Sequence, residues 1–370
     1  MKRREFLAGA GIAAGVAATS LASSFPKPAL AQERIEWKMV TSWPKGLPGL
    51  DTGAQRLATR ISELSEGRLV VQLYSGGELV PPLACFDAVA DGTADMAHDA
   101  AYYHLSKSPA TGFFTAVPFG MTAAELNAWI YYGGGQELWD ELYEPFGLKA
   151  FLAGNTGCQM GGWFRNEINS IDDLAGLKFR MPGQGGQVLS RLGVTVMTLP
   201  AGEIFANLQS GALDGTEWVG PYNDLALGFY KVARNYYWPG FHEPGPALQC
   251  TVSKSKYESL PENLQQIIAS CCSQENDLIH AEFNARSGPA LASLVNEHGV
   301  SLKQFPREVL EAFGQASGEL MQEVYDDGDE ITRKISESFF KFRREIRLWT
   351  RISDQAYTNA RSLTFDYPQG

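Results

Sequence analysis

Two repeating patterns of apolar residues alternate along the first two-thirds of the chain. Residues 35–39 alternate between apolar and charged side chains, as in a β-strand with one buried face. Apolar residues then recur at helical spacing over residues 54–64, Gly67 follows as a helix terminator, and a second strand pattern covers residues 69–73. This strand–helix–strand order predicts an α/β fold.

A short internal echo indicates two units of similar construction. Residues 86–95 and 205–214 share Phe, Gly and Asp at the same spacing, and each predicts a helix that ends in a glycine turn and leads into a strand. We expect these strands to deliver residues 98–99 and 217–218 to the carboxyl ends of two sheets, where ligands of open α/β folds bind. A length of 370 residues also exceeds the roughly 250 to 300 residues that one core serves.

The C-terminal third has a different pattern. From Arg307 to about Ser362 the turn signals of the earlier regions are lost, except around residues 326–329. The simplest prediction is two helices, the second unusually long. An apolar stripe on this second helix packs either on the α/β body or on a second subunit; it consists of Ile331, Ile335, Phe339, Phe342, Ile346, Trp349 and Ile352.

The N-terminus predicts export. Residues 2–7 (KRREFL) form a twin-arginine pattern, an Ala/Gly-rich run follows to Ala22, and residues 29–31 (ALA) resemble a cleavage site. The alternative is an arginine-flanked helix that stays attached. We therefore expect a signal peptide over residues 1–31 and a mature chain in the periplasm.

Composition excludes several classes of function. The net charge of -11 argues against nucleic acid and against anionic lipid surfaces. Five cysteines are too few and too scattered for a disulfide framework, and the pair at residues 271–272 lies in a helical pattern over residues 264–283. No cysteine or histidine spacing typical of a soft-ligand metal site occurs.

Three polar residues interrupt segments that otherwise predict buried strands. The guanidinium of Arg180 suits a carboxylate held by two hydrogen bonds, and the alternative is an internal ion pair. Glu217, next to Trp218, suits a hard cation or a ligand hydroxyl; the alternative is a surface glutamate beside a core tryptophan. Together with the Gln159 amide and the Trp218 carbonyl, Glu217 would form an all-oxygen set suited to Na⁺ or Ca²⁺.

Other candidates are less specific. Tyr103, in the segment Tyr-Tyr-His that follows the first-lobe strand, either bonds a ligand or lines the rim of the cleft. Glu243 lies among prolines and glycines in a crossover between lobes, as a hinge residue or a ligand contact. Residues 183–189 predict a tight turn that opens a helix and do not match a phosphate loop. No nucleophile, base and orienting group form a pattern, so no catalytic residue is assigned.

These segments resemble the extracytoplasmic solute-binding subunits of TRAP transporters (DctP type). Within that family they are similar to the branch that binds 2-oxo acids and related monocarboxylates together with a metal cation. The resemblance rests on the export signal and on the segments GEL at 77–79, NTGCQMGGWFR at 155–165, GLKFR at 176–180 and DGTEWVGP at 214–221.

The resemblance implies roles for individual residues. Arg180 would bind the substrate carboxylate, and Gln159 would contact both substrate and cation. Glu217 and the Trp218 carbonyl would be cation ligands, with Glu243 near the substrate. Two departures concern the size of the ligand: the Tyr-Tyr-His loop, and Phe-His at 241–242 where bulkier aromatic residues are expected.

The fold expected from the resemblance is a two-lobed α/β periplasmic binding protein with a hinge and long C-terminal helices. Lobe 1 would comprise residues 32–152 and about 246–300, lobe 2 residues 153–245, and residues 301–370 would form helices that exchange in a homodimer.

The expected function is capture of a pyruvate-like 2-oxo acid, or a related 2-hydroxy acid, and its delivery to the TRAP permease subunits in the membrane. The alternative is an exported enzyme acting on a small carboxylic acid. Tyr103 and Trp218 would complete the substrate site. Na⁺ is preferred over Ca²⁺ because the predicted ligand set contains one carboxylate.

Overall fold

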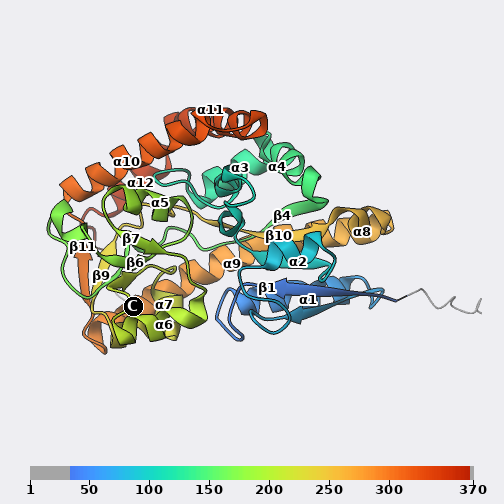
Figure 1. The fold of residues 1–370 in the computed structure, drawn as a ribbon, viewed down its shortest axis with the longest axis horizontal. Coiled ribbons are helices and arrows are strands. Elements are labelled where there is room, and N and C mark those ends of the chain that lie inside the picture. Colours follow the sequence, from blue (N-terminus) through green and yellow to red (C-terminus); the bar gives the residue numbers. More distant parts are fainter. Residues whose placement is uncertain (1–33, 367–370) are drawn as a thin grey trace, which may run out of the picture.

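The computed structural model describes residues 34–366 and contains two β-sheets with helices packed around them (Figure 1). The predicted signal peptide lies outside the described residues. Each sheet is mixed, and strands that are distant in sequence are neighbours in both. The alternation of strands and helices predicted from the sequence is therefore confirmed, as is the α/β class.

The first sheet has the strand order β2-β1-β3-β10-β4. Its parallel strands β1 and β2 pair from Ile35 opposite Leu69, and β10 runs antiparallel to both β3 and β4. Helices α1 (Asp51–Leu64) and α2 (Cys85–Ala90) connect its first strands. The strands are β1 (Ile35–Thr41), β2 (Leu69–Tyr74), β3 (Met96–Asp99), β4 (Leu148–Asn155) and β10 (Ala247–Ser253).

The second sheet has the order β11-β9-β5-β8-β6-β7. Helices α5 (Gly183–Arg191), α6 (Ala201–Ser210) and α7 (Pro221–Leu227) connect its strands. Residues 301–304, expected to begin the C-terminal helical region, instead pair with β9 as β11. The strands are β5 (Gly162–Phe164), β6 (Lys178–Arg180), β7 (Thr195–Met197), β8 (Gly215–Thr216), β9 (Asn235–Trp238) and β11 (Ser301–Gln304).

The internal echo forms equivalent structures in the two sheets. Helix α2 is followed by Gly92 at φ +82° and then by β3, and α6 is followed by Gly211 at φ +79° and then by β8. Both glycines adopt the left-handed conformation that residues with a side chain avoid. The shared Gly therefore marks the same turn in each unit, as predicted.

One long helix contacts the elements around both sheets. Helix α9 (Glu262–Asn296) packs against β4 and α1 on one side and α7 on the other, and it crosses the middle of the molecule in Figure 1. Ile279 of α9 lies over Gly53 and Gly154, where an added Cβ would approach it to 2.6 and 2.9 Å. Two glycines without side chains thus allow the helix to approach the first sheet closely.

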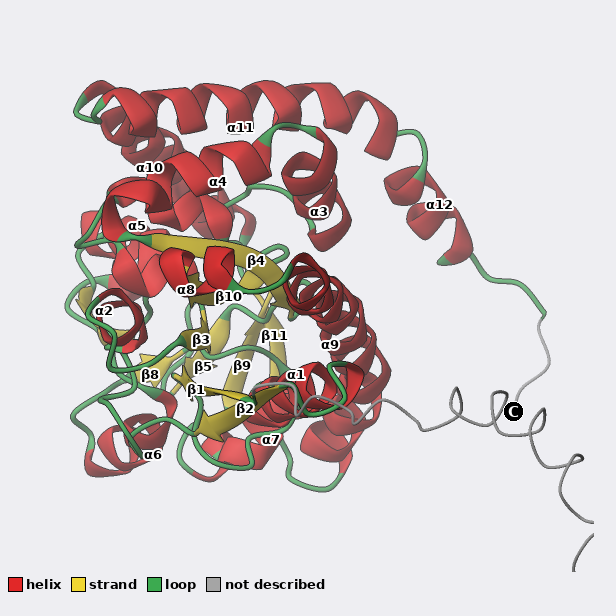
Figure 2. Ribbon diagram, turned by 90° about the vertical axis from the view of Figure 1, so that its right-hand side faces the viewer, coloured by secondary structure: helices red, strands yellow, loops and turns green. Residues whose placement is uncertain are grey.

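The C-terminal region contains three helices rather than the two expected: α10 (Arg307–Asp326), α11 (Glu330–Thr350) and α12 (Asp354–Arg361). Asp329 caps α11 by accepting a hydrogen bond from the Thr332 amide. Figure 2 shows α12 turning away from the end of α11. Within residues 34–366, no helix is long and apolar enough to span a membrane.

The apolar stripe divides between two environments. Ile335 and Phe339 are buried, and Phe339 makes edge contacts with Phe113 and Trp129. Further along, Trp349 and Ile352 are 62% and 70% exposed. The first part of the stripe therefore packs on the body of the molecule, and the second part does not.

Shorter elements complete the molecule. They are α3 (Ala123–Tyr132), α4 (Gly135–Tyr143), α8 (Lys254–Ser259) and the 3₁₀ helices Ala101–His104, Pro109–Phe114, Glu144–Phe146, Ile171–Leu174 and Phe229–Lys231.

Candidate functional site

Two chain segments that cross between the sheets are bonded to each other. Both bonds are between backbone groups. The Gly240 N–H donates to the Gln159 backbone carbonyl at 2.9 Å, and the Gln159 backbone N–H donates to the Glu243 backbone carbonyl at 3.1 Å. A Cβ on Gly240 would lie 2.3 Å from the Gln159 oxygen, so only glycine allows this approach. The crossing thereby fixes Gln159 and Glu243 next to each other.

A small cavity lies between the sheets at this crossing. Its volume of about 10 Å³ leaves room for about one water molecule. Trp43, Tyr102 and Tyr103 line it from the side of the first sheet, and Trp218 from the second. The crossing segments contribute their polar side chains. Predicted site residues among the lining are Tyr103, Gln159, Trp218 and Glu243.

Arg180, at the end of β6, forms a buried ion pair with the Glu217 carboxylate. Its Nε also donates to the Leu199 carbonyl at 3.0 Å, and its Nη1 to the Glu217 carbonyl at 3.2 Å. The guanidinium carbon lies 4.9 Å from the centre of the Trp218 ring. The sequence left open an internal ion pair for Arg180, and the structure contains one; Nη2 has no hydrogen-bond partner among residues 34–366.

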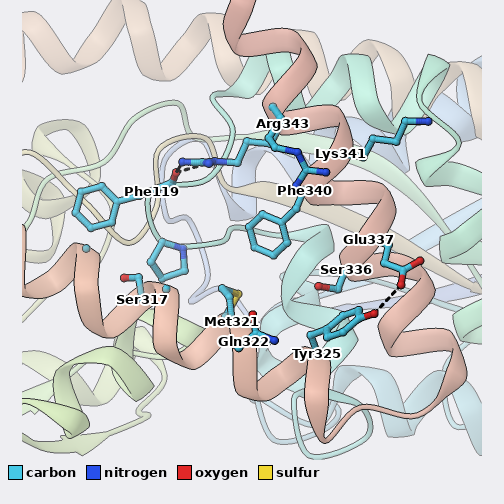
Figure 3. Close-up of a pocket in the computed structure, with 14 residues that line it drawn as sticks. Phe119, Ser317, Met321, Gln322, Tyr325, Ser336, Glu337, Phe340, Lys341 and Arg343 are labelled. Carbon is cyan, nitrogen blue, oxygen red and sulfur yellow. Dashed lines mark hydrogen bonds between the residues drawn. The ribbon is translucent and has the colours of Figure 1, made fainter.

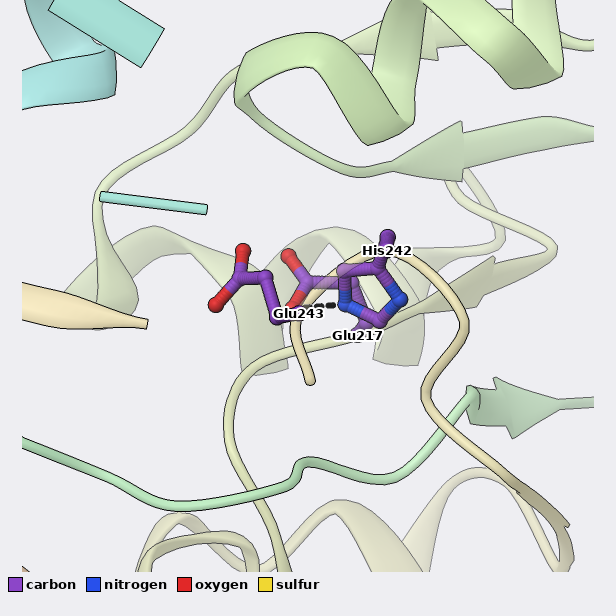
Figure 4. Close-up of side chains that lie close together, drawn as sticks. All are labelled: Glu217, His242 and Glu243. Carbon is purple, nitrogen blue, oxygen red and sulfur yellow. Dashed lines mark hydrogen bonds and ion pairs between the residues drawn. The ribbon is translucent and has the colours of Figure 1, made fainter. Parts of the chain in front are cut away.

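Glu217 belongs to a buried cluster with His242 and Glu243, shown in Figure 4. His242 Nε2 lies 3.3 Å from Glu217 Oε2, and one possible ligand atom from each of the three residues lies within 4.8 Å of the others. Glu217 is 1% exposed, so its interpretation as a surface glutamate is wrong. Gly185 makes room for the imidazole, because a Cβ there would lie 2.6 Å from the His242 Cβ.

His242 was not predicted as a site residue. Its position between Phe241 and Glu243 in a turn-rich crossover is the one signal in the sequence, and by itself that position predicts only a change in ligand size. No spacing motif connects residue 242 with residue 217, because the fold brings them together from separate segments.

Burial and neighbouring charge alter the acid–base properties of the cavity. Burial, and then the nearby Glu217 carboxylate, raise the pKa of Glu243 well above its usual range, while Arg180 opposes the shift. Burial likewise raises the pKa of Tyr103 to about 12. At neutral pH both tyrosines therefore present protonated hydroxyl groups, since the pKa of buried Tyr102 is raised as well.

Two buried oxygen atoms at the cavity lack partners within the described part of the chain. Gln159 donates its amide nitrogen to Thr156 Oγ1 at 3.0 Å, which leaves Oε1 without a hydrogen bond. Glu243 Oε2 also has none. Buried polar atoms normally find partners, and carboxylate and amide oxygens are the ligands that hard cations prefer. The donor set therefore fits a bound cation.

The first-sheet counterpart of Glu217 does not reach the cavity. His98 accepts from the Trp43 indole at 2.9 Å and contacts the Ala153 carbonyl at 2.9 Å, while Asp99 bonds His104 and Gln249, both at 2.7 Å. The side chains of His98 and Asp99 are buried in the interior of the first lobe, and the hydrogen bonds above satisfy them. Of the two residue pairs expected at the strand ends, His98 and Asp99 do not line the cavity, whereas Trp218 of the second pair does.

A larger surface hollow, about 620 Å³, lies elsewhere, between α10 and α11 (Figure 3). Phe119, Met321 and Phe340 line it, and Arg343 donates to the Phe119 carbonyl at 2.6 Å. It shares no lining residue with the cavity at the crossing. The size of this hollow alone therefore does not identify it as the site indicated by the motifs.

Comparisons with known proteins give a consistent result. The family model described as bacterial extracellular solute-binding protein, family 7 (DctP), matches residues 40–327. A monocarboxylate 2-oxoacid-binding periplasmic protein of Nostoc sp. is 41% identical over 97% of this chain and 98% of its own length.

Two similar solved structures carry a ligand. A TRAP periplasmic solute-binding protein from Pseudoalteromonas atlantica, with bound sodium and pyruvate, is 38% identical with a TM-score of 0.86, over 90% of this chain and 100% of that one. Another from Colwellia psychrerythraea, with bound calcium and pyruvate, is 41% identical with a TM-score of 0.86, over 89% of this chain and 100% of that one.

Proposed function

The chain belongs to the bacterial extracellular solute-binding proteins of family 7, the solute-binding proteins of TRAP transporters, and we propose that its solute is a small 2-oxo acid such as pyruvate. The observation that carries this proposal is the cavity at the crossing. It is small, its lining residue Trp218 lies against the buried guanidinium of Arg180, and its lining residues Gln159 and Glu243 each have an oxygen atom without a partner within residues 34–366. The charge and the unpartnered oxygens suit a short carboxylic acid with a cation, and the cavity, which has room for about one water molecule, must widen to take them.

Each predicted site residue has a proposed role. Arg180 binds the solute carboxylate, for which Nη2 is the nitrogen without a partner within residues 34–366. Glu217, Gln159 Oε1 and the Trp218 carbonyl hold the cation, Na⁺ or Ca²⁺. When bound, the cation supplies positive charge that offsets the buried carboxylates and attracts the solute oxygens. Tyr103 and Glu243 complete the cavity next to the solute.

Contacts that join the two sheets support a closed form of the two lobes. Asn223 of α7 donates to the Pro48 carbonyl at 2.8 Å, and the rings of Trp218 and Trp43 meet edge to face at 6.2 Å. A solute that touches residues of both lobes only in this arrangement favours it over an open one. We propose that the closed, loaded protein is the form recognised by the membrane permease subunits.

Further features belong to the same proposal. The protein acts in the periplasm after export by the twin-arginine route, and it binds its solute without converting it. The first lobe comprises residues 34–155 with about 246–300, so that it holds all of β4, and the second comprises residues 156–245 with β11. A homodimer covers the exposed apolar side chains of α11, of α12 and of the turn between them, among them Trp349, Ile352 and Tyr357.

Calorimetry tests the solute. The protein is unfolded, dialysed against a chelator and refolded, and pyruvate is then titrated in buffer with NaCl or with CaCl₂. We expect one pyruvate per chain, and mass spectrometry of solute released from untreated protein should find a small carboxylic acid. No heat with pyruvate, lactate or other short 2-oxo acids in either buffer would overturn the proposal. Conversion of the acid on incubation would instead favour the enzyme.

A further inference from the structure

The proposed cation site has a second carboxylate, that of Glu243, which the family resemblance places near the solute. Glu243 is 3% exposed, lies in the cluster with Glu217 and His242, and has an oxygen without a partner in the described part of the chain. Gln159 Oε1, on a side chain that is 5% exposed, is a second such atom lining the same cavity. Two buried, unpartnered oxygens therefore accompany the acidic cluster.

The charges around the cavity favour a cation with two positive charges. With a cation bound next to both carboxylates, Glu217 and Glu243 each carry one negative charge, a bound monocarboxylate adds a third, and Arg180 supplies one positive charge. Na⁺ would leave a net negative charge in a buried site, which is costly, whereas a divalent cation leaves none. Two carboxylates this close also repel each other unless a cation lies near both.

Distances within the cluster are compatible with a shared cation. Ligands bound at about 2.1 Å to one small divalent ion lie about 3 Å apart. His242 Nε2 and Glu217 Oε2 are 3.3 Å apart, and Arg180 pairs with the other oxygen, Oε1. The nitrogen and oxygen that face each other are thus free of the arginine.

The imidazole adds a chemical preference. Na⁺ and Ca²⁺ take oxygen ligands, whereas divalent ions of the first transition row also bind imidazole nitrogen. His242 is 1% exposed, and its Nε2 faces the carboxylates (Figure 4). A nitrogen donor in this position extends the range of cations beyond the all-oxygen set of Gln159, Glu217 and the Trp218 carbonyl.

We propose that Glu217, His242 and Glu243 form a divalent-cation site, which accepts Mn²⁺ as well as Ca²⁺ and in which Glu243 sets the preference for two charges over one. The inference deepens the proposed function, on which it rests for the monocarboxylate that shares the cation. Binding of the metal alone does not depend on that solute.

The first experiment titrates metal alone into chelator-stripped, refolded full-length protein in 100 mM NaCl, with MnCl₂ or CaCl₂ as the probe. We expect one Mn²⁺ per chain, seen by calorimetry and by loss of the free Mn²⁺ electron paramagnetic resonance signal. Glu243→Gln should weaken Mn²⁺ binding at least 30-fold, and pyruvate binding to this variant should then be supported by Na⁺ as well as by Ca²⁺.

A second variant tests the imidazole nitrogen of His242 as a metal ligand without disturbing the fold. His242→Gln replaces the imidazole with an amide oxygen, so Mn²⁺ affinity should fall at least tenfold while Ca²⁺ affinity stays within threefold. His298→Gln, on a residue stacked against Tyr230, is the matched control and should change neither. Because His242→Gln keeps a polar group next to Glu217, it tests the site even if Glu243→Gln fails to fold.

The outcomes distinguish this inference from the proposed function. If neither divalent ion binds, with or without pyruvate, while Na⁺ supports pyruvate binding, the divalent site is wrong and the 2-oxo acid function stands. Equal losses of Mn²⁺ and Ca²⁺ in His242→Gln would also overturn the nitrogen ligand. If Mn²⁺ binds as expected but no 2-oxo acid binds with any cation, the metal site stands and the proposed function fails.

Discussion

Two buried clusters of a carboxylate and a histidine occupy related positions in the two sheets. Asp99 follows the echo helix α2 and pairs with His104 at 2.7 Å; Glu217 follows the echo helix α6 and contacts His242 at 3.3 Å. In the first cluster the second Asp99 oxygen accepts from Gln249, so both oxygens have partners. In the second cluster, atoms of Gln159, Arg180 and Glu243 have no partner in the part of the chain that the structure describes.

The difference teaches that burial of charged groups does not by itself mark a binding site. Both clusters are shielded from solvent, and both contain residue types that suit chemistry. The first is satisfied within the protein and therefore stabilises it, whereas the second lacks partners that a ligand or cation would supply. The predictions below test this distinction.

The largest effect is expected from Arg180→Ala. Pyruvate affinity should fall more than 1000-fold, about 4 kcal/mol, because the only guanidinium in the described part of the cluster is lost. The free energy of unfolding should fall by about 3 to 5 kcal/mol, since Glu217 is left as an unpaired buried charge. Calorimetry and urea unfolding measure the two quantities.

Arg191→Ala provides the matched control. It removes an exposed ion pair with Glu323 and should change the free energy of unfolding by less than about 0.5 kcal/mol. Pyruvate affinity within a few fold of wild type in Arg180→Ala would reject the carboxylate-binding role.

Asp99→Ala should lower the stability of the protein but leave its pyruvate affinity nearly unchanged. The free energy of unfolding is expected to fall by about 3 kcal/mol, because donors on His104 and Gln249 lose their buried partners. Pyruvate affinity of the folded fraction should stay within threefold of wild type. A loss of affinity greater than tenfold, with the fold intact by circular dichroism, would place Asp99 in the binding machinery and remove the distinction between the clusters.

Asp224 combines features of both clusters and predicts a pH dependence. Burial raises the pKa of this carboxyl to about 7, although Trp163, Tyr236 and the Val219 amide donate hydrogen bonds to it. The folded state keeps a proton that the unfolded state releases near pH 4. The free energy of unfolding should therefore fall by about 2 kcal/mol between pH 5 and 7.

Asp224→Asn tests whether Asp224 causes this pH dependence, because asparagine does not titrate. The variant should lose this part of the fall in unfolding free energy with pH. Urea unfolding at pH 5, 6 and 7 gives the comparison. An unchanged slope in the variant would show that Asp224 is ionised throughout, so that hydrogen bonds alone offset its burial.

Gln159→Leu should give the smallest effect, about tenfold in pyruvate affinity or ~1.4 kcal/mol. The free energy of unfolding should change little, because leucine removes a buried oxygen without a partner within residues 34–366 but also removes the hydrogen bond that Gln159 donates to Thr156. Gln184→Leu is the matched control: its amide is also buried and unpartnered within residues 34–366, but it does not line the cavity. Equal losses in both variants would show that position at the cavity is irrelevant.

Local patterns predicted the architecture well, because period and turn chemistry act over a few residues. Strands β1 and β2, helix α1 and both echo glycines follow directly from apolar spacing and from residues that tolerate positive φ. The end of the C-terminal helix was missed, because residues 351–353 carry no glycine or proline to mark the break before α12.

The site was predicted only in part, for a physical reason. Polar residues in segments predicted as buried strands singled out Gln159, Arg180 and Glu217 as candidates, although only Arg180 lies in a strand. The direct pairing of Arg180 with Glu217, and the approach of His242 to both carboxylates, depend on strand order and on a crossing of distant segments. Such juxtapositions leave no periodic signal in the sequence.

The edge-to-face pair of Trp43 and Trp218 lies between the two sheets, and its geometry should affect the ultraviolet spectrum of the protein. Their ring centres are 6.2 Å apart, one on each side of the cavity. Indole rings this close couple their ultraviolet transitions, and separation of the lobes would uncouple them. Near-ultraviolet circular dichroism of the unlabelled protein should therefore follow opening and closing in real time, with Trp43→Phe as the silent reference.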